Sequence, residues 1–300
     1  MNILVTGGTV FVSRYMAEYF RDLGHNVYVL NRGSRPQSSG VIHICADRNN
    51  LGDKLKDYSF DIVLDATAYN KRDVLNLHNA LGEFGTYILL SSSAVYPDTN
   101  KQPFKESDNI GSNQYWGYYG LGKVEAEEYV MTNIKDHYII RPPYLYGPMN
   151  NVYREAFLFE CMEKNMAFYI PKDGKMKLQF FYIGDLARFV EKIIELKPKD
   201  RIFNVGNKEV IDINKWAKLC NQVLNKKSNI VYINDDVPQR SFFPFLDYSY
   251  VLDVKKQDTI LSKLTPMNEG LLASYNWYKE NKSLVRRKPL IEFIKDNYLN

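Results

Sequence analysis

Residues 1–32 read MNILVTGGTVFVSRYMAEYFRDLGHNVYVLNR, and this stretch decides the fold. A short apolar run ends at Thr6-Gly7-Gly8-Thr9, and apolar or aromatic side chains then recur at helical spacing from Phe11 to Leu23. Gly24 stands where a helix C-cap belongs, and Val27-Tyr28-Val29-Leu30 has the character of a strand. The order predicts strand, glycine turn, helix and strand, which is a βαβ unit.

The glycine turn is a candidate site for a pyrophosphate. Free backbone N–H groups and the positive end of the helix dipole face an anion at such a turn. A plain βαβ unit with a tight turn is the alternative interpretation. The predicted cofactor contacts are the turn and the first N–H groups of the helix, namely Gly7, Gly8, Thr9, Phe11 and Val12.

Composition leaves room for a sizeable core. The chain has 300 residues, of which 45% are hydrophobic, and this length accommodates one to two domains. The net charge of +4 is mild, and basic and acidic residues are mixed along the chain, which argues against a dedicated nucleic-acid binder. The strongest basic cluster, Arg286-Arg287-Lys288, is typical of a solvated terminal segment.

Cysteine and histidine usage predicts no metal site. Cys45, Cys161 and Cys220 lie far apart without metal-ligand spacing, and the four histidines form no ligand pattern. Scattered free cysteines favour a reducing compartment. The first residues enter a strand at once, and no apolar run approaches the ~20 residues of a membrane span, so we expect a cytoplasmic protein with no membrane partner.

Further cofactor contacts are expected where later strands end. Asn31 and Arg32 follow the second strand, where an acidic residue would favour NAD; a neutral and a cationic residue lean toward NADP, although a loop with one exposed arginine is the alternative. Asp47 follows the third strand and can accept a hydrogen bond from the adenine amino group. Small residues after the fourth strand would let a cofactor lie close, and these are Ala66, Thr67 and Ala68.

Hydroxyls and a Tyr-x-x-x-Lys pair form the candidate catalytic group. The fifth strand ends in Ser91-Ser92-Ser93, at the edge of a parallel sheet where ligands bind. Tyr119 and Lys123 are four residues apart on one helix face. An ammonium group stabilises phenolate and brings a phenol into working range as a base, and a serine hydroxyl can orient the substrate oxygen. Two other such pairs, Tyr275/Lys279 and Tyr278/Lys282, lie in a terminal helix and are most simply chance.

This combination resembles the extended short-chain dehydrogenases/reductases of the NAD-dependent epimerase/dehydratase family. Three more stretches resemble that family, namely Arg141–Pro148, Gln179–Ala187 and Phe203–Gly206. The resemblance implies that Ser92 is the catalytic hydroxyl, with Ser93 as the near alternative, that Tyr119 is the acid/base, and that Lys123 modulates it and contacts a ribose. It also implies a cofactor contact at Pro142 and substrate contacts at Ser93, Tyr144 and Arg240.

The resemblance implies an α/β fold, a Rossmann-like doubly wound parallel sheet with a smaller interleaved C-terminal substrate lobe. Residues 1–147 and about 177–206 would bind the dinucleotide, and about 148–176 with 207–300 would form the lobe. The implied activity is NAD- or NADP-dependent oxidation, reduction or epimerisation of a nucleotide-activated sugar or a related hydroxyl or carbonyl compound, by a homodimer. Dehydration is disfavoured, because Ser93-Ala94 stands where dehydratases of the family usually carry an acidic pair.

A narrower resemblance points to an atypical branch that includes chloroplast stem-loop-binding proteins. It rests on Gly7–Val12, Asn31-Arg32-Gly33, Ala46-Asp47-Arg48, Phe243-Pro244-Phe245 and Asn268–Tyr275, and it adds Arg48 to the expected cofactor contacts. An RNA-binding or scaffold protein on a degenerate fold is therefore the alternative function. Val10 and Ser13, where glycines are usual, support that alternative and predict weaker cofactor binding. Retention of Tyr119 and Lys123 favours an enzyme.

Overall fold

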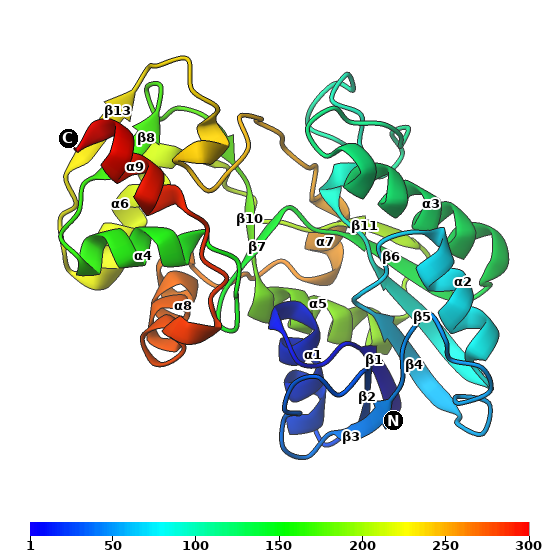
Figure 1. The fold of residues 1–300 in the computed structure, drawn as a ribbon. Coiled ribbons are helices and arrows are strands. Elements are labelled where there is room, and N and C mark those ends of the chain that lie inside the picture. Colours follow the sequence, from blue (N-terminus) through cyan, green and yellow to red (C-terminus); the bar gives the residue numbers. More distant parts are fainter. Residues whose placement is uncertain (300) are drawn as a thin grey trace. The chain divides into compact units, whose positions relative to one another are not determined.

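The computed structural model describes residues 1–299 and divides the chain into two compact units (Figure 1). Unit 1 contains Met1–Pro143, Ile183–Gly206 and Leu252–Lys263. Unit 2 contains Tyr144–Tyr182, Asn207–Val251 and the chain from Leu264 onward. The two units alternate along the sequence, so each is assembled from separate segments.

Unit 1 is built on a seven-stranded parallel sheet of order β11-β6-β5-β4-β1-β2-β3. The chain adds β2 and β3 on one side of β1 and then places β4 on its other side. Ligands of doubly wound sheets bind at such a reversal, outside the carboxyl ends of the strands. The predicted fold class is confirmed. The strands are β1 (Asn2–Thr6), β2 (Asn26–Asn31), β3 (Ile42–Cys45), β4 (Phe60–Asp65), β5 (Phe84–Leu90), β6 (His137–Arg141) and β11 (Ile202–Asn204).

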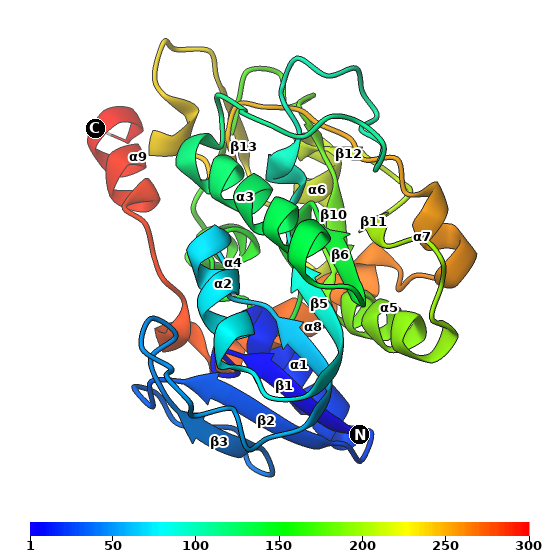
Figure 2. The ribbon, with the colours of Figure 1, turned by 90° about the vertical axis from the view of Figure 1, so that its right-hand side faces the viewer.

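Helices cover both faces of this sheet (Figure 2). α1 packs against α5, and α2 packs against α3. Central strands are accordingly apolar on both faces: Ile3, Leu4 and Val5 are all fully buried. Asn70 caps α2 by accepting from the Asp73 N–H at 3.1 Å. The helices are α1 (Phe11–Asp22), α2 (Lys71–Ala80), α3 (Gly117–Asn133), α5 (Ile183–Leu196) and α7 (Lys255–Ile260).

Unit 2 combines short strand pairs with four helices around an aromatic core. Trp216 stacks on Phe180 and meets Phe245 edge-on. Within residues 1–299, no helix is long and apolar enough to cross a bilayer. The pairs are β7 (Tyr144–Tyr146) with β10 (Phe180–Tyr182), β8 (Phe168–Pro171) with β13 (Ile230–Ile233), and β9 (Lys177–Leu178) with β12 (Ile211–Asp212); the helices are α4 (Glu155–Glu163), α6 (Ile213–Leu224), α8 (Met267–Glu280) and α9 (Leu290–Tyr298).

The boundaries of the units differ from the expected ones. We expected changes near residues 147 and 177, and the structure changes unit after Pro143 and again after Tyr182. Leu252–Lys263, expected in the lobe, clusters with unit 1. The reason is local: the Gln257 side chain accepts from the Gly206 N–H at 2.7 Å and donates to the Gly206 carbonyl at 3.2 Å.

Candidate active site

The glycine turn after β1 has a backbone that only glycine adopts easily. Gly7 and Gly8 have φ angles of 93° and 84°, in the left-handed region. A Cβ on Gly7 would lie 2.7 Å from the Ser13 hydroxyl, and one on Gly8 would overlap the Val29 side chain. The Gly7 N–H donates to the Leu30 carbonyl at 2.8 Å, which fastens the turn to β2.

The start of α1 offers uncapped N–H groups. No side chain caps this helix, so its first amides remain for an anion. Val10 is the N-cap residue with φ −140° and ψ 135°, an extended conformation that suits valine. The left-handed conformation falls instead on Phe11, with φ 36°. The missing glycine at position 10 is therefore no backbone obstacle, and the turn and helix end fit a dinucleotide pyrophosphate.

Asn31, at the end of β2, joins the glycine turn to the following loop. Its amide donates to the Gly7 carbonyl at 2.6 Å and to the Gln37 side chain at 2.9 Å. Its side-chain oxygen accepts from the Gly33 N–H at 2.9 Å. Arg32 is exposed beside it. The neutral Asn31 amide, which is hydrogen-bonded within the protein, and the exposed Arg32 thus occupy the place where an NAD enzyme would carry a carboxylate.

The side chain of Arg48, in the loop after β3, is held by contacts within the protein. Its guanidinium pairs with both carboxylate oxygens of Asp65 and also donates to the Thr67 hydroxyl at 3.0 Å and the Asp73 carbonyl at 2.9 Å. Burial alone would raise the pKa of Asp65, but the charge and hydrogen bonds of Arg48 hold it below its usual value. Asp47, by contrast, is exposed. Arg48 thus anchors the loop that carries Asp47.

Asp65 is the centre of a buried polar network under the glycine turn. It is fully buried and also accepts from the hydroxyls of Thr6, at 2.8 Å, and Tyr87. The Thr6 hydroxyl in turn accepts from the N–H groups of Ala66 and Thr67 at 3.0 and 3.1 Å. The small residues after β4 are therefore held by hydrogen bonds from beneath.

Tyr119 and Lys123 lie on one face of α3, as predicted. Tyr119 is 39% exposed, whereas Lys123 is only 4% exposed. The Lys123 Nζ lies 6.0 Å from the centroid of the Tyr119 ring and 5.6 Å from that of Tyr69. It donates to the carbonyls of Ala68 at 2.7 Å, in the loop after β4, and Leu90 at 2.8 Å, at the end of β5. Lysine, phenol and strand ends therefore meet at one place.

The electrostatics of Lys123 reflect its burial. Desolvation lowers its pKa to about 8, against the opposing attraction of Asp65 and Glu127. The ammonium therefore still predominates at neutral pH, but the uncharged amine is reached at a much lower pH than for an exposed lysine. A nearby phenolate or an anionic ligand would shift that balance toward the ammonium.

The serine cluster continues from β5 into a short 3₁₀ turn, Ser93–Val95. Ser92 is half-buried, and its hydroxyl accepts from the Ala94 N–H at 3.2 Å. Ser93 is 3% exposed, and its N–H donates to the Pro142 carbonyl at 3.0 Å. Ser92, more accessible than Ser93, remains the predicted catalytic hydroxyl, and Pro142 lies beside the cluster.

The predicted substrate residues Tyr144 and Arg240 belong to unit 2, where two further cations accompany them. The Arg154 guanidinium lies 4.8 Å from the centroid of the Tyr144 ring. Burial and then the charge of Arg154 lower the pKa of Arg240, and burial followed by both arginines lowers that of Lys288. Among the described residues, no carboxylate lies within ion-pairing distance of these three cations. Such a cluster suits an anionic ligand.

Sequence reasoning did not identify Asp65, Glu127 or Arg141 as parts of the site. Glu127 is fully buried and pairs with Arg141, which is 2% exposed. Two signals were available: an acidic residue closing the apolar run of β4, and a glutamate one helical turn beyond Lys123. The partners of these carboxylates lie on other strands, so spacing alone could not supply them.

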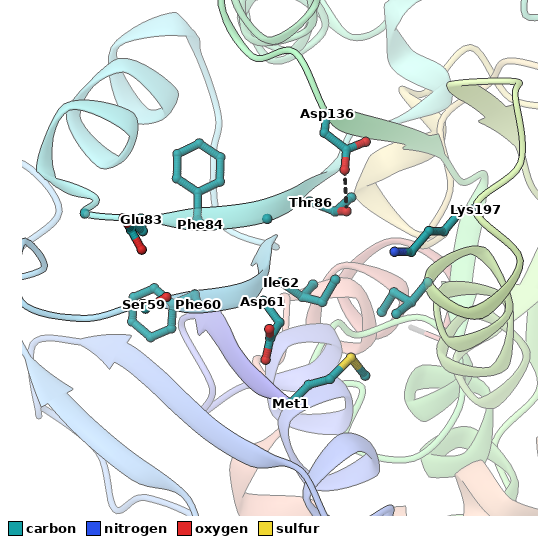
Figure 3. Close-up of a pocket in the computed structure, with 13 residues that line it drawn as sticks. Met1, Ser59, Phe60, Asp61, Ile62, Glu83, Phe84, Thr86, Asp136 and Lys197 are labelled. Atoms are coloured by element: carbon teal, nitrogen blue, oxygen red, sulfur yellow. Dashed lines mark hydrogen bonds between the residues drawn. The ribbon is translucent and has the colours of Figure 1, made fainter.

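A cavity of about 760 Å³ lies beside the amino ends of the unit 1 strands, opposite the carboxyl ends where the candidate site lies (Figure 3). Its lining residues Ser59, Glu83 and Asp136 directly precede β4, β5 and β6, at the amino ends of the strands. The Thr86 hydroxyl donates to Asp136 there at 2.8 Å. Nucleotides bind doubly wound sheets at the carboxyl ends, so this cavity is separate from the candidate site. Within residues 1–299, no three His, Cys, Asp or Glu side chains are grouped to hold a metal.

Comparison with known proteins agrees with this geometry. Residues 3–206 match the model of the NAD dependent epimerase/dehydratase family. A chloroplast stem-loop binding protein of 41 kDa from Arabidopsis thaliana is 26% identical, over 91% of this chain and 78% of that protein. A putative UDP-glucose 4-epimerase from Methanocaldococcus jannaschii is 24% identical, over 93% of this chain and 99% of that protein.

A solved structure shares the fold. The UDP-glucuronic acid 4-epimerase from Bacillus cereus, in complex with UDP-glucuronic acid and NAD, superposes with a TM-score of 0.71. The two chains are 19% identical, and the match covers 93% of this chain and 99% of that one.

Proposed function

Because this chain belongs to the NAD-dependent epimerase/dehydratase family, we propose that it uses a nicotinamide dinucleotide to oxidise and epimerise a hydroxyl-bearing carbon of a nucleotide-activated sugar. The observation that carries this proposal is the meeting of Tyr119 and Lys123 with the loop after β4 and the end of β5. The similarity to a putative UDP-glucose 4-epimerase and to a UDP-glucuronic acid 4-epimerase supports the reaction type.

The chemistry assigned to this chain is proton transfer. When bound, the nicotinamide supplies the hydride acceptor. Tyr119, accessible to a ligand, acts as its phenolate: it takes the proton of the sugar hydroxyl, becomes the neutral phenol, and later returns the proton. The ammonium of Lys123 stabilises the phenolate that serves as the base, because opposite charges favour the ionised phenol. Ser92 orients the substrate oxygen by a hydrogen bond.

The proposed substrate is anionic. Arg154, Arg240 and Lys288 of unit 2 lie close enough to repel one another electrostatically. A diphosphate linking a nucleoside to a sugar carries charges that would satisfy them, and a neutral free sugar would not. Unit 2 is therefore proposed as the substrate lobe and unit 1 as the dinucleotide-binding domain.

NADP is the proposed preferred cofactor. Asn31 carries no charge that would repel a 2′-phosphate, and the exposed Arg32 is available to attract one. Arg32→Ala should weaken NADPH binding about tenfold, the scale of a charge-assisted hydrogen bond, and leave NADH binding unchanged. Equal effects on both cofactors would exclude Arg32 as the discriminating residue.

The test of the function is fluorescence titration with NADH and NADPH, followed by incubation with UDP-glucose and UDP-glucuronic acid and separation of the products. Cofactor binding with inversion of either sugar is the expected result. Failure to bind either cofactor at millimolar concentration, together with salt-sensitive RNA binding, would favour the RNA-binding alternative. A 4-keto-6-deoxy product would instead indicate dehydration.

A homodimer is the proposed assembly, through α3. Tyr118, Leu121 and Met131 are exposed apolar side chains on that helix, at 95%, 37% and 40%. Sedimentation equilibrium should give twice the chain mass. A monomer at micromolar concentration would contradict this assembly.

A further inference from the structure

Glu127 occupies a special place on α3. It lies one helical turn beyond Lys123 and two beyond Tyr119, so all three share a face of the helix. Its side chain is fully buried. A carboxylate removed from water is tolerated only when its oxygens have strong partners, and the partners of Glu127 come from two strands outside its own helix.

Arg141 is the first partner. Its Nε lies 3.0 and 3.1 Å from the two Glu127 oxygens, its second nitrogen pairs with the same carboxylate, and its third donates to the Tyr96 hydroxyl at 2.7 Å. The planar guanidinium fork fixes direction as well as distance. Because Arg141 ends β6 and precedes Pro142, this ion pair locks α3 to the Pro142 segment.

Ser91 is the second partner. It directly follows β5, and its hydroxyl donates to a Glu127 oxygen. The next residue is Ser92, the proposed catalytic hydroxyl. A single carboxylate therefore joins the helix of Tyr119 and Lys123, the serine-bearing strand end and the Pro142 segment. The Ser93 N–H also donates to the Pro142 carbonyl at 3.0 Å, which joins the serine turn directly to the Pro142 segment.

We infer that Glu127 is a positioning residue of the active site, which sets the places of Ser92, Lys123 and Pro142 relative to one another through Ser91 and Arg141. This inference rests on the proposed function. Stability alone does not require an ion pair here, because well-packed apolar side chains of similar volume often replace a buried ion pair without loss of stability. An apolar replacement would lack the directional bonds that hold three segments in register.

The experiment compares bound NADH in four variants. Ser91→Ala removes one hydrogen bond and keeps the ion pair, and Glu127→Gln removes the charge. Glu127→Leu/Arg141→Met replaces the pair by apolar side chains. It leaves no unpaired buried charge, so it serves in place of Glu127→Gln if that variant does not fold. Glu125→Gln, an exposed residue on the same helix, is the matched control. For each folded variant we measure the NADH dissociation constant, the emission and lifetime of the bound nicotinamide, and the melting temperature.

We expect the dissociation constant to stay within about threefold of wild type, because the adenosine and pyrophosphate contacts lie on other elements. The nicotinamide emission and lifetime should shift toward those of free NADH in the double variant and less in Ser91→Ala, with Glu125→Gln unchanged. Wild-type emission in a stably folded double variant would overturn the positioning role while leaving the proposed function intact. Wild-type protein that binds neither NADH nor NADPH would overturn the proposed function, and the positioning role with it.

Discussion

Replacing Lys123 by methionine should change how stability depends on pH. The ammonium is buried, and its pKa falls from 10.5 to about 8 on folding. Between those values the unfolded chain binds more protons than the folded one, so the free energy of unfolding rises with pH. The contribution is unfavourable below pH 8, where both states are protonated, and that penalty fades as pH rises toward 10.5.

The magnitude follows from the two pKa values. If only the unfolded chain bound this proton, the free energy of unfolding would rise by about 1.4 kcal/mol per pH unit. Because Lys123 of the folded protein titrates near pH 8, it binds on average about half a proton between pH 7 and 9, so about half of that rise is realised. Wild type should therefore gain about 1.4 kcal/mol over this interval relative to Lys123→Met. Methionine also leaves the Ala68 and Leu90 carbonyls without their donor, but that cost is the same at both pH values.

Urea unfolding at pH 7 and pH 9, followed by circular dichroism, measures this difference. Lys135→Met, which alters an exposed lysine of the same unit, should run parallel to wild type at both pH values. Parallel behaviour of Lys123→Met as well would refute the reasoning, since it would mean that burial does not penalise the Lys123 ammonium.

Three further changes test other parts of the chain. Asp65→Asn should destabilise the protein by about 3 kcal/mol in thermal unfolding, because Arg48 would keep a buried charge without its counterion; a loss below about 1 kcal/mol would show that solvent reaches the pair. Cys45 should be the one thiol that reacts rapidly with Ellman's reagent, because burial raises the pKa of the other two, Cys161 and Cys220. Cys45→Ser should therefore abolish the fast phase of the reaction. A remaining fast phase would contradict the burial of the other two thiols. Val10→Gly should bind NADPH about fivefold more tightly by calorimetry, since the valine Cβ branches would no longer crowd the pyrophosphate; equal or weaker binding would show that the turn accommodates valine.

Much of unit 1 follows from local sequence signals. The run Asn2–Val5, the glycine turn and the helical spacing that follows predict the first βαβ unit, and β1, α1 and β2 are found there. Helical spacing also places Tyr119 and Lys123 on one face, as the structure has them. These features depend on neighbours within a few residues, which is the range that periodicity reports.

Long-range pairing explains the differences. The narrower resemblance places Arg48 at the cofactor, and that expectation remains a prediction. Its ion pair with Asp65, on another strand, was not predicted. The helices α7 and α9 were not predicted either: α7 is short, and its Gln257 is fully buried against Gly206, a contact that no local pattern signals. Lys288 is exposed, as expected of a solvated segment, but its proximity to Arg240 and Arg154 was not predicted.

The alternation of the two units along the chain limits how the protein can be cut and made. No single proteolytic nick can release either unit as one continuous fragment, because segments of each lie between segments of the other. During synthesis, unit 1 stays incomplete until Lys263 has left the ribosome, since Leu252–Lys263 supplies the Gln257 amide that binds both backbone groups of Gly206. A shortened chain ending at residue 206 would lack this contact and would still carry Tyr144–Tyr182 of unit 2, so truncation there does not yield unit 1 alone.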